Sequence, residues 1–169
     1  MKKFLQAGVC LLSLSALLSP HAEQTEQQHG DWTLGCESAE GGADQGCILF
    51  QNLILKDDRQ PVLQFAVGRA PDDEVATVII TLPLGISLPP GITVRIDEGD
   101  DANFPVERCE PDGCQAGMKL RQQTIDRLRG GNKITITFYD GERQPIYVPL
   151  SLKGFSKGMD ALLAKRGQN

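Results

Sequence analysis

Histidine is scarce in this chain, and its scarcity excludes the common hydrolase triads. The 169 residues include two histidines, His21 and His29, so none follows position 29. The string Gly-Phe-Ser-Lys-Gly at residues 154–158 matches the nucleophile elbow of a hydrolase, but Ser156 has Asp160 and no histidine downstream to activate it. We expect Ser156 to cap a helix instead, by accepting a hydrogen bond from an unpaired backbone N–H. The sequence therefore predicts no catalytic residues and no enzymatic activity.

Patterns for cofactors, metals and nucleic acids are absent too. Gly130 and Gly131 lack the Lys and Ser/Thr of a phosphate-binding loop. The acidic loop at residues 97–103 lacks the spacing of a calcium loop, so we expect a solvated turn there. The chain has a formal net charge of −5 and no basic footprint for nucleic acid or an anionic bilayer. We therefore predict no cofactor, no metal site and no nucleic-acid partner.

Long apolar runs are missing after the N-terminus, which itself has the pattern of a leader. Lysines at the second and third positions precede an apolar run at residues 4–18, and Ser-Pro-His-Ala follows. This order is typical of a secretory signal peptide, and the run is short for a membrane span. We expect a signal peptide at residues 1–22 and a single domain at residues 23–169, with a retained anchor as the alternative. The expected protein is periplasmic, secreted or surface-associated, and it does not span a membrane after leader cleavage.

Cysteine is present in a number that fits export. With Cys10 in the leader, the chain keeps Cys36, Cys47, Cys109 and Cys114, and an even number in an exported chain is typical of disulfides. Local pairing is the most economical of the three possible connectivities, because the last two cysteines flank Pro-Asp-Gly in turn order and the first two close a Gly-rich loop. By loop entropy each bridge stabilises the fold by roughly 2–3 kcal/mol. A redox pair or a zinc site is the alternative, but the Cys-x-x-Cys spacing is missing.

Short apolar segments with alternating polarity predict a β-rich domain. The most apolar stretch after the leader, residues 78–97, has the pattern of two strands, and Pro83, Pro89 and Pro90 each remove a backbone donor between them. We expect residues 84–88 to form a short strand or an extended crossover, and the polar residues 23–30 to be a loose terminus. The expected strands cover residues 31–36, 46–55, 63–67, 75–82, 92–97, 115–120, 133–139 and the region of 146–150.

Helical patterns occur only late in the chain. A short helix is expected at residues 124–129, and an amphipathic helix opens near Gly154, with one apolar stripe. The stripe consists of Phe155, Met159, Leu162 and Leu163. We expect Arg127 and its neighbouring arginines to form a solvated helix face, with an acidic partner as the alternative. These patterns predict an all-β antiparallel sandwich of about eight strands, with a short helix and a C-terminal amphipathic helix.

The order of several motifs resembles the invasion-associated locus B family over nearly the whole chain after the leader. The motifs are Gly30-Asp31-Trp32 before Cys36, Cys47 before Gln51, Leu82-Pro83-Leu84-Gly85, Leu88-Pro89-Pro90-Gly91, Asp97, Cys109 with Gly113-Cys114, and Leu150-Ser151-Leu152-Lys153-Gly154-Phe155. The resemblance implies a small exported β-rich protein of the Gram-negative envelope, with no established enzymatic activity. It also implies that the four cysteines are structural positions.

The functional prediction combines the absent chemistry with this resemblance. We expect a non-enzymatic, disulfide-braced envelope protein that binds an envelope or host protein, with a link to host-cell invasion suggested by the family name. The alternative is a periplasmic small-ligand carrier with a pocket between the sheets, near Trp32 or under residues 83–91. We expect Trp32, the single tryptophan, to be a core anchor rather than a ligand platform.

Overall fold

The computed structural model describes residues 24–38, 44–54, 61–69 and 75–165, so the expected signal peptide lies outside the described residues. Within these ranges the chain forms eleven strands and two helices. The strands are β1 (Gln24–His29), β2 (Trp32–Ser38), β3 (Asp44–Ile54), β4 (Pro61–Gly68), β5 (Thr77–Leu82), β6 (Ile92–Ile96), β7 (Ala102–Phe104), β8 (Arg108–Glu110), β9 (Gly113–Lys119), β10 (Lys133–Tyr139) and β11 (Pro145–Ser151). The helices are α1 (Gln122–Gly130) and α2 (Phe155–Ala164).

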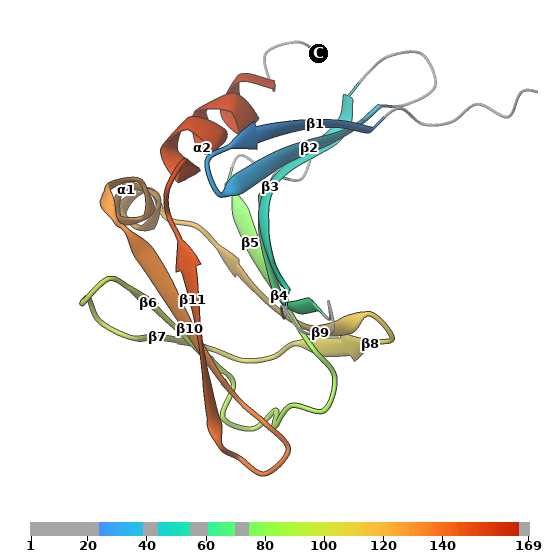
Figure 1. The fold of residues 1–169 in the computed structure, drawn as a ribbon, viewed down its shortest axis with the longest axis vertical. Coiled ribbons are helices and arrows are strands. Elements are labelled where there is room, and N and C mark those ends of the chain that lie inside the picture. The colour runs from blue at the N-terminus through green and yellow to red at the C-terminus, as the bar shows by residue number, and fades with distance from the viewer. Residues whose placement is uncertain (1–23, 39–43, 55–60, 70–74, 166–169) are drawn as a thin grey trace, which may run out of the picture.

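The strands form two antiparallel sheets. The large sheet has the order β1-β2-β3-β4-β5-β9-β8, and the small sheet has the order β11-β10-β6-β7. Figure 1 shows the small sheet on one side of the large sheet, with both helices at the same end of the molecule. The expected all-β antiparallel sandwich with two helices is confirmed, with eleven strands in place of about eight.

The proline-rich segment between β5 and β6 carries the chain from the large sheet to the small sheet. Residues 83–91 form turns and irregular backbone, so the extended crossover is correct and the short strand is not. Gly91 has a φ of +67°, and a side chain there would collide with the carbonyl oxygen of Phe104. β6 has the half-buried alternation that its sequence predicts, with Ile92 and Val94 buried.

The polar N-terminal segment is ordered, which corrects the expectation of a loose terminus. β1 pairs with β2 along its whole length, from Gln24 opposite Glu37 to His29 opposite Trp32. An edge strand is held by backbone hydrogen bonds on one side and does not require apolar side chains. The sequence pattern of hydrophobicity therefore could not predict it.

The core lies between the sheets and under α2, which packs on β1, β2 and β3. Phe155, Met159 and Leu162 of the predicted stripe are buried, whereas Leu163 is exposed, which corrects that part of the prediction. Gly158 permits the close approach, because a Cβ there would collide with the side chain of Leu49.

Both disulfides join direct partners on neighbouring strands. Cys36 and Cys47 link β2 to β3, and Cys109 and Cys114 link β8 to β9. The structure therefore has the local pairing among the three possible ones. Cys36 and Cys114 are buried, whereas Cys109 lies exposed on the short edge strand β8.

Candidate functional site

The serine of the G-x-S-x-G string has a structural contact that differs from the predicted one. Gly154, not Ser156, is the N-cap residue of α2, and no side chain caps this helix. The Ser156 Oγ instead donates a hydrogen bond of 3.0 Å to the carbonyl oxygen of Arg129 at the end of α1. Among the hydrogen bonds of the described residues none joins Ser156 to His29, and Asp160 forms an ion pair of 2.7 Å with Arg129. These contacts tie the two helices together and do not form a catalytic triad.

The corner where the β1–β2 turn meets the β11–α2 turn explains two of the sequence motifs. Gly30 and Gly154 both have positive φ, and each faces the backbone next to the other. A Cβ on Gly154 would overlap the carbonyl oxygen of His29, and one on Gly30 would lie 2.5 Å from the Lys153 oxygen. The Asp31 N–H donates a hydrogen bond of 3.0 Å to the same Lys153 oxygen. Glycine is therefore required on both sides of this contact.

Trp32 lies beneath this corner and belongs to the core, as expected. Its ring is fully buried against Phe65 and Phe155, and its Nε1 donates a hydrogen bond of 2.9 Å to the Ser151 carbonyl oxygen. Gln51 is buried beside it and donates to the carbonyl oxygens of Asp31 (2.8 Å) and Ser151 (3.2 Å). Two strand turns far apart in the sequence are thus joined by one tryptophan and one glutamine.

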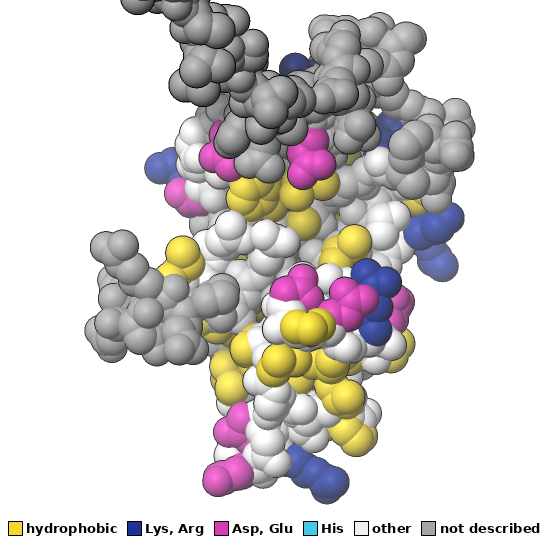
Figure 2. Space-filling model, turned by 90° about the vertical axis from the view of Figure 1, so that its right-hand side faces the viewer, with side chains coloured by type: hydrophobic (Ala, Val, Ile, Leu, Met, Phe, Trp, Pro, Cys, Tyr) yellow, Lys and Arg dark blue, Asp and Glu magenta, His cyan; other side chains and the backbone are white. Residues whose placement is uncertain are grey.

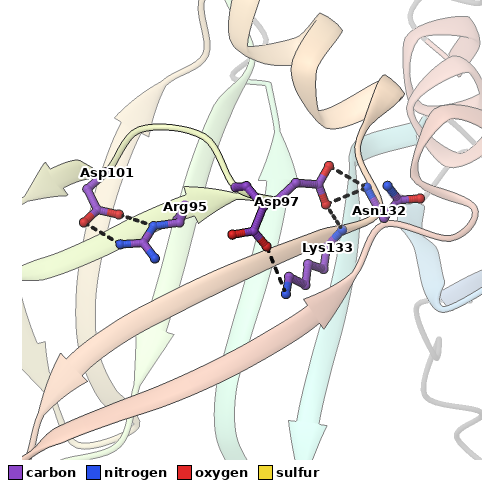
Figure 3. Close-up of polar contacts among 6 residues, drawn as sticks. Arg95, Asp97, Asp101, Asn132 and Lys133 are labelled. Carbon is purple, nitrogen blue, oxygen red and sulfur yellow. Dashed lines mark hydrogen bonds and ion pairs between the residues drawn. The ribbon is translucent and has the colours of Figure 1, made fainter.

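The acidic loop after β6 is held by protein groups (Figure 3). The Asp97 carboxylate accepts hydrogen bonds from the backbone N–H groups of Asn132 (3.1 Å) and Lys133 (3.0 Å). The Arg95 guanidinium donates two hydrogen bonds, of 2.6 and 2.8 Å, to Asp101 and holds the pKa of this exposed carboxyl below its usual range. Within the described residues no group of three or more His, Cys, Asp and Glu side chains is placed to hold a metal ion.

The outer face of the large sheet, turned away from the small sheet, presents apolar side chains to solvent. Phe50, Ala66, Ile79 and Gly117 are register partners on β3, β4, β5 and β9, so they form one row across the sheet. Ile48 lies on the adjacent row, and Ile48 and Ile79 are 43% and 42% exposed. Figure 2 looks onto this side, where hydrophobic side chains gather between acidic side chains above and a mixed charged group below.

Small residues shape this surface. A Cβ on Gly35 would lie 3.1 Å from the Phe50 ring, and one on Gly68 would lie 3.1 Å from the Ile48 side chain. Each of these large side chains therefore lies over a glycine of the neighbouring strand. β3 bows so that its concave side faces away from β10 and β11 (Figure 1). The apolar row thus lies on the hollow side of a curved sheet.

A polar row runs beside the apolar one. Its register partners are Asn52, Gln64, Thr81, Gln115 and Arg108, on β3, β4, β5, β9 and β8. Gln64 donates a hydrogen bond of 2.9 Å to Asn52, and Arg108 donates two to the Gln115 side-chain oxygen, at 3.0 and 2.7 Å. These contacts fix the orientation of the amide groups along the row.

Two open hollows lie along the polar row and share Gln115. One, of about 650 Å³, has Ile54, Val62 and Leu84 among its apolar walls. The other, of about 370 Å³, lies at Ile79 and Gly117. We call the two hollows together with the apolar row the outer groove. Its groups suit binding of apolar and hydrogen-bonding surface, and it contains no nucleophile paired with a base.

No motif or periodicity in the sequence points directly to the outer groove. Ile48 and Ile79 lie at alternate positions to the buried Leu49 and Ile80, so alternation shows that they share the opposite face. It does not show whether another layer covers that face. Alternation alone therefore does not identify binding residues on this face.

The described residues form a small antiparallel β-sandwich with two disulfide bridges. None of the described helices is long and apolar enough to cross a membrane. A family model described as "Invasion associated locus B (IalB) protein" matches residues 32–163, and the chain belongs to this family. The resemblance inferred from the motifs is therefore confirmed.

Relatives with similar sequences carry matching descriptions. Two invasion protein B homologs of Brucella abortus, from strain 2308 and from biovar 1 strain 9-941, are each 26% identical over 155 residues. Each alignment covers 91% of this chain and 88% of the relative. The crystal structure of invasion associated protein B from Bartonella henselae superposes with a TM-score of 0.74 at 21% identity, over 85% of this chain and 98% of that one. This last likeness supports the fold.

Proposed function

We propose that this protein is an exported, non-enzymatic envelope protein that binds a partner protein in the outer groove. The observation that carries the proposal is the apolar surface of this face, where Ile79 of the apolar row and Ile48 of the adjacent row are each more than two-fifths exposed, beside an ordered row of amides. Protein interfaces combine an apolar centre with a hydrogen-bonding rim in this way. The open hollows, of about 650 and 370 Å³, suit side chains of a protein surface better than an enclosed small ligand.

Export is supported by two independent features. The first 22 residues have the charged, apolar and small-residue order of a signal peptide, followed by a domain at residues 23–169. The four remaining cysteines are paired in the structure, and disulfides persist in oxidising compartments. We infer a periplasmic location, with secretion or surface association as the further step that a host partner requires. The names of the Brucella relatives are the support for a link with invasion.

Site-specific photocrosslinking in intact cells tests the partner proposal. A photoreactive residue at position 79 places the probe in the outer groove, and one at position 147 places it on the other sheet. Tyr147 is a matched control because it is also an exposed strand residue. We expect a discrete crosslinked protein from position 79 and none from position 147. The same species from both positions, or none from position 79, contradicts the proposal.

The absence of enzymatic function has its own test. Ser156→Ala removes the hydroxyl that joins α2 to the end of α1, at a cost of about 1 kcal/mol in unfolding free energy. Any activity of the protein should persist in this variant. Covalent labelling of Ser156 by a serine-directed reagent would contradict the assignment.

The small-ligand alternative requires a site other than the predicted ones. The Trp32 ring is fully buried and its N–H is bonded, so it offers no face to a ligand. Pro83 and Leu84, from the other predicted location, line the outer groove and not the space between the sheets. A different hollow, between the sheets beside α1, favours this second function.

A further inference from the structure

A hollow of about 170 Å³ lies between the two sheets, at the end where α1 crosses. Val94 and Ile96 of β6 and Phe104 of β7 line it from the small sheet, and Met118 of β9 lines it from the large sheet. Met118 lies on the same side of its strand as the buried Cys114 and Ala116, so the hollow is continuous with the core side of both sheets. Gly99 and the polar side chains of Asp100, Gln123, Thr124 and Arg127 complete its lining at the open side.

Arg127 of α1 is the cation at this hollow. No ion pair or side-chain hydrogen bond joins Arg127 to another of the described residues, whereas Arg129 on the same helix pairs with Asp160. Arg127 and Asp100 both line this hollow and an adjoining one of about 400 Å³, and no ion pair joins their side chains. A guanidinium without a carboxylate partner, next to an apolar hollow, provides a bidentate donor for an anion.

The size of the hollow limits the apolar part of a ligand. Cavities of about 150 Å³ with apolar walls bind benzene. A hollow of about 170 Å³ therefore accepts one ring or a short alkyl chain. We propose that it binds a small amphipathic carboxylate, with the apolar group between the sheets and the carboxylate on Arg127. This inference gives the small-ligand alternative a site and a ligand class, and it does not depend on the outer groove.

Titration of the isotope-labelled mature protein with hexanoate, followed by NMR, tests the proposal. We expect saturable shifts of the methyl signals of Val94, Ile96 and Met118, and weaker binding of hexanol, which lacks the charge. Arg127→Gln should lower hexanoate affinity about tenfold. Arg121→Gln removes the same charge from an exposed position on the edge of α1, outside the hollow, and should leave the affinity unchanged.

A second variant tests the volume requirement without changing charge. Ala102 lines the hollow and is the register partner of Val94, so Ala102→Leu should fill the space and abolish hexanoate binding. The fluorescence of Trp32 reports whether each variant is folded. The proposal is overturned if hexanoate leaves the three methyl signals unshifted in the unaltered protein, if hexanol binds as well as hexanoate, or if both arginine variants weaken binding equally.

Discussion

Replacing Gly154 by alanine tests how the corner between the two turns holds the fold. Gly154 has a φ of +93°, and its Cβ would overlap the His29 carbonyl oxygen. Gly85 is a matched control, because it has a φ of +85° and no heavy atom within 4 Å of its Cβ position. Gly85→Ala should cost about 1–2 kcal/mol, the strain of a left-handed residue. Gly154→Ala adds a forced displacement of packed backbone, which costs about a further 1–3 kcal/mol.

Urea denaturation followed by the fluorescence of Trp32 measures both variants, since this single tryptophan is buried beneath the corner. The account predicts that Gly154→Ala unfolds at a clearly lower urea concentration than Gly85→Ala. Equal loss of stability in the two variants would show that only the backbone conformation matters. The close approach of the two turns would then have no energetic role.

Three further predictions concern the bridges, the buried amide and the ion pair. Partial reduction should open the Cys109–Cys114 bridge, which has an exposed cysteine, before the Cys36–Cys47 bridge, and thiol mapping detects the order. Full reduction should lower the melting temperature. Four free thiols in exported material would contradict the pairing. Gln51→Leu should lower the unfolding free energy by about 1–3 kcal/mol, because the two partly buried hydrogen bonds to the Asp31 and Ser151 carbonyl oxygens are lost. No change in a urea titration would refute this. The hydrogen bond from Arg95 lowers the folded pKa of Asp101. The stabilisation from this contact is therefore present above the unfolded pKa of Asp101 and is lost as pH falls through its folded pKa. Carboxyl NMR should show Asp101 titrating below its usual range, and its pKa should return towards that range in Arg95→Gln.

Much of the fold could be predicted from periodicity. The alternation of isoleucines and phenylalanine with threonines predicts β10 with the observed bounds, Lys133–Tyr139. The stripe of α2 is also largely correct, because Phe155 and Met159 are apolar at helical spacing and face one surface. In both elements the buried face is encoded in the side chains themselves.

The candidate sites depend on tertiary arrangement and could not be predicted in this way. Ile79 is exposed because none of the described elements covers its face of the sheet. No local sequence pattern encodes whether a second layer covers a sheet face. The hollow beside Arg127 arises where α1 crosses the end of two sheets. Ser156 was predicted to be a cap because it opens a helix, but the nearby end of α1 provides a different partner.

The central claim is tested most directly by measuring the affinity of the purified crosslinked partner for two variants of this protein. Ile79→Asp places a charge in the outer groove, and Tyr147→Asp places one on the exposed side of the small sheet. The account predicts that the first variant weakens binding by about tenfold or more and that the second binds as the unaltered protein does. Unchanged affinity of Ile79→Asp, with binding lost in Tyr147→Asp, would place the interface on the other sheet and contradict the account.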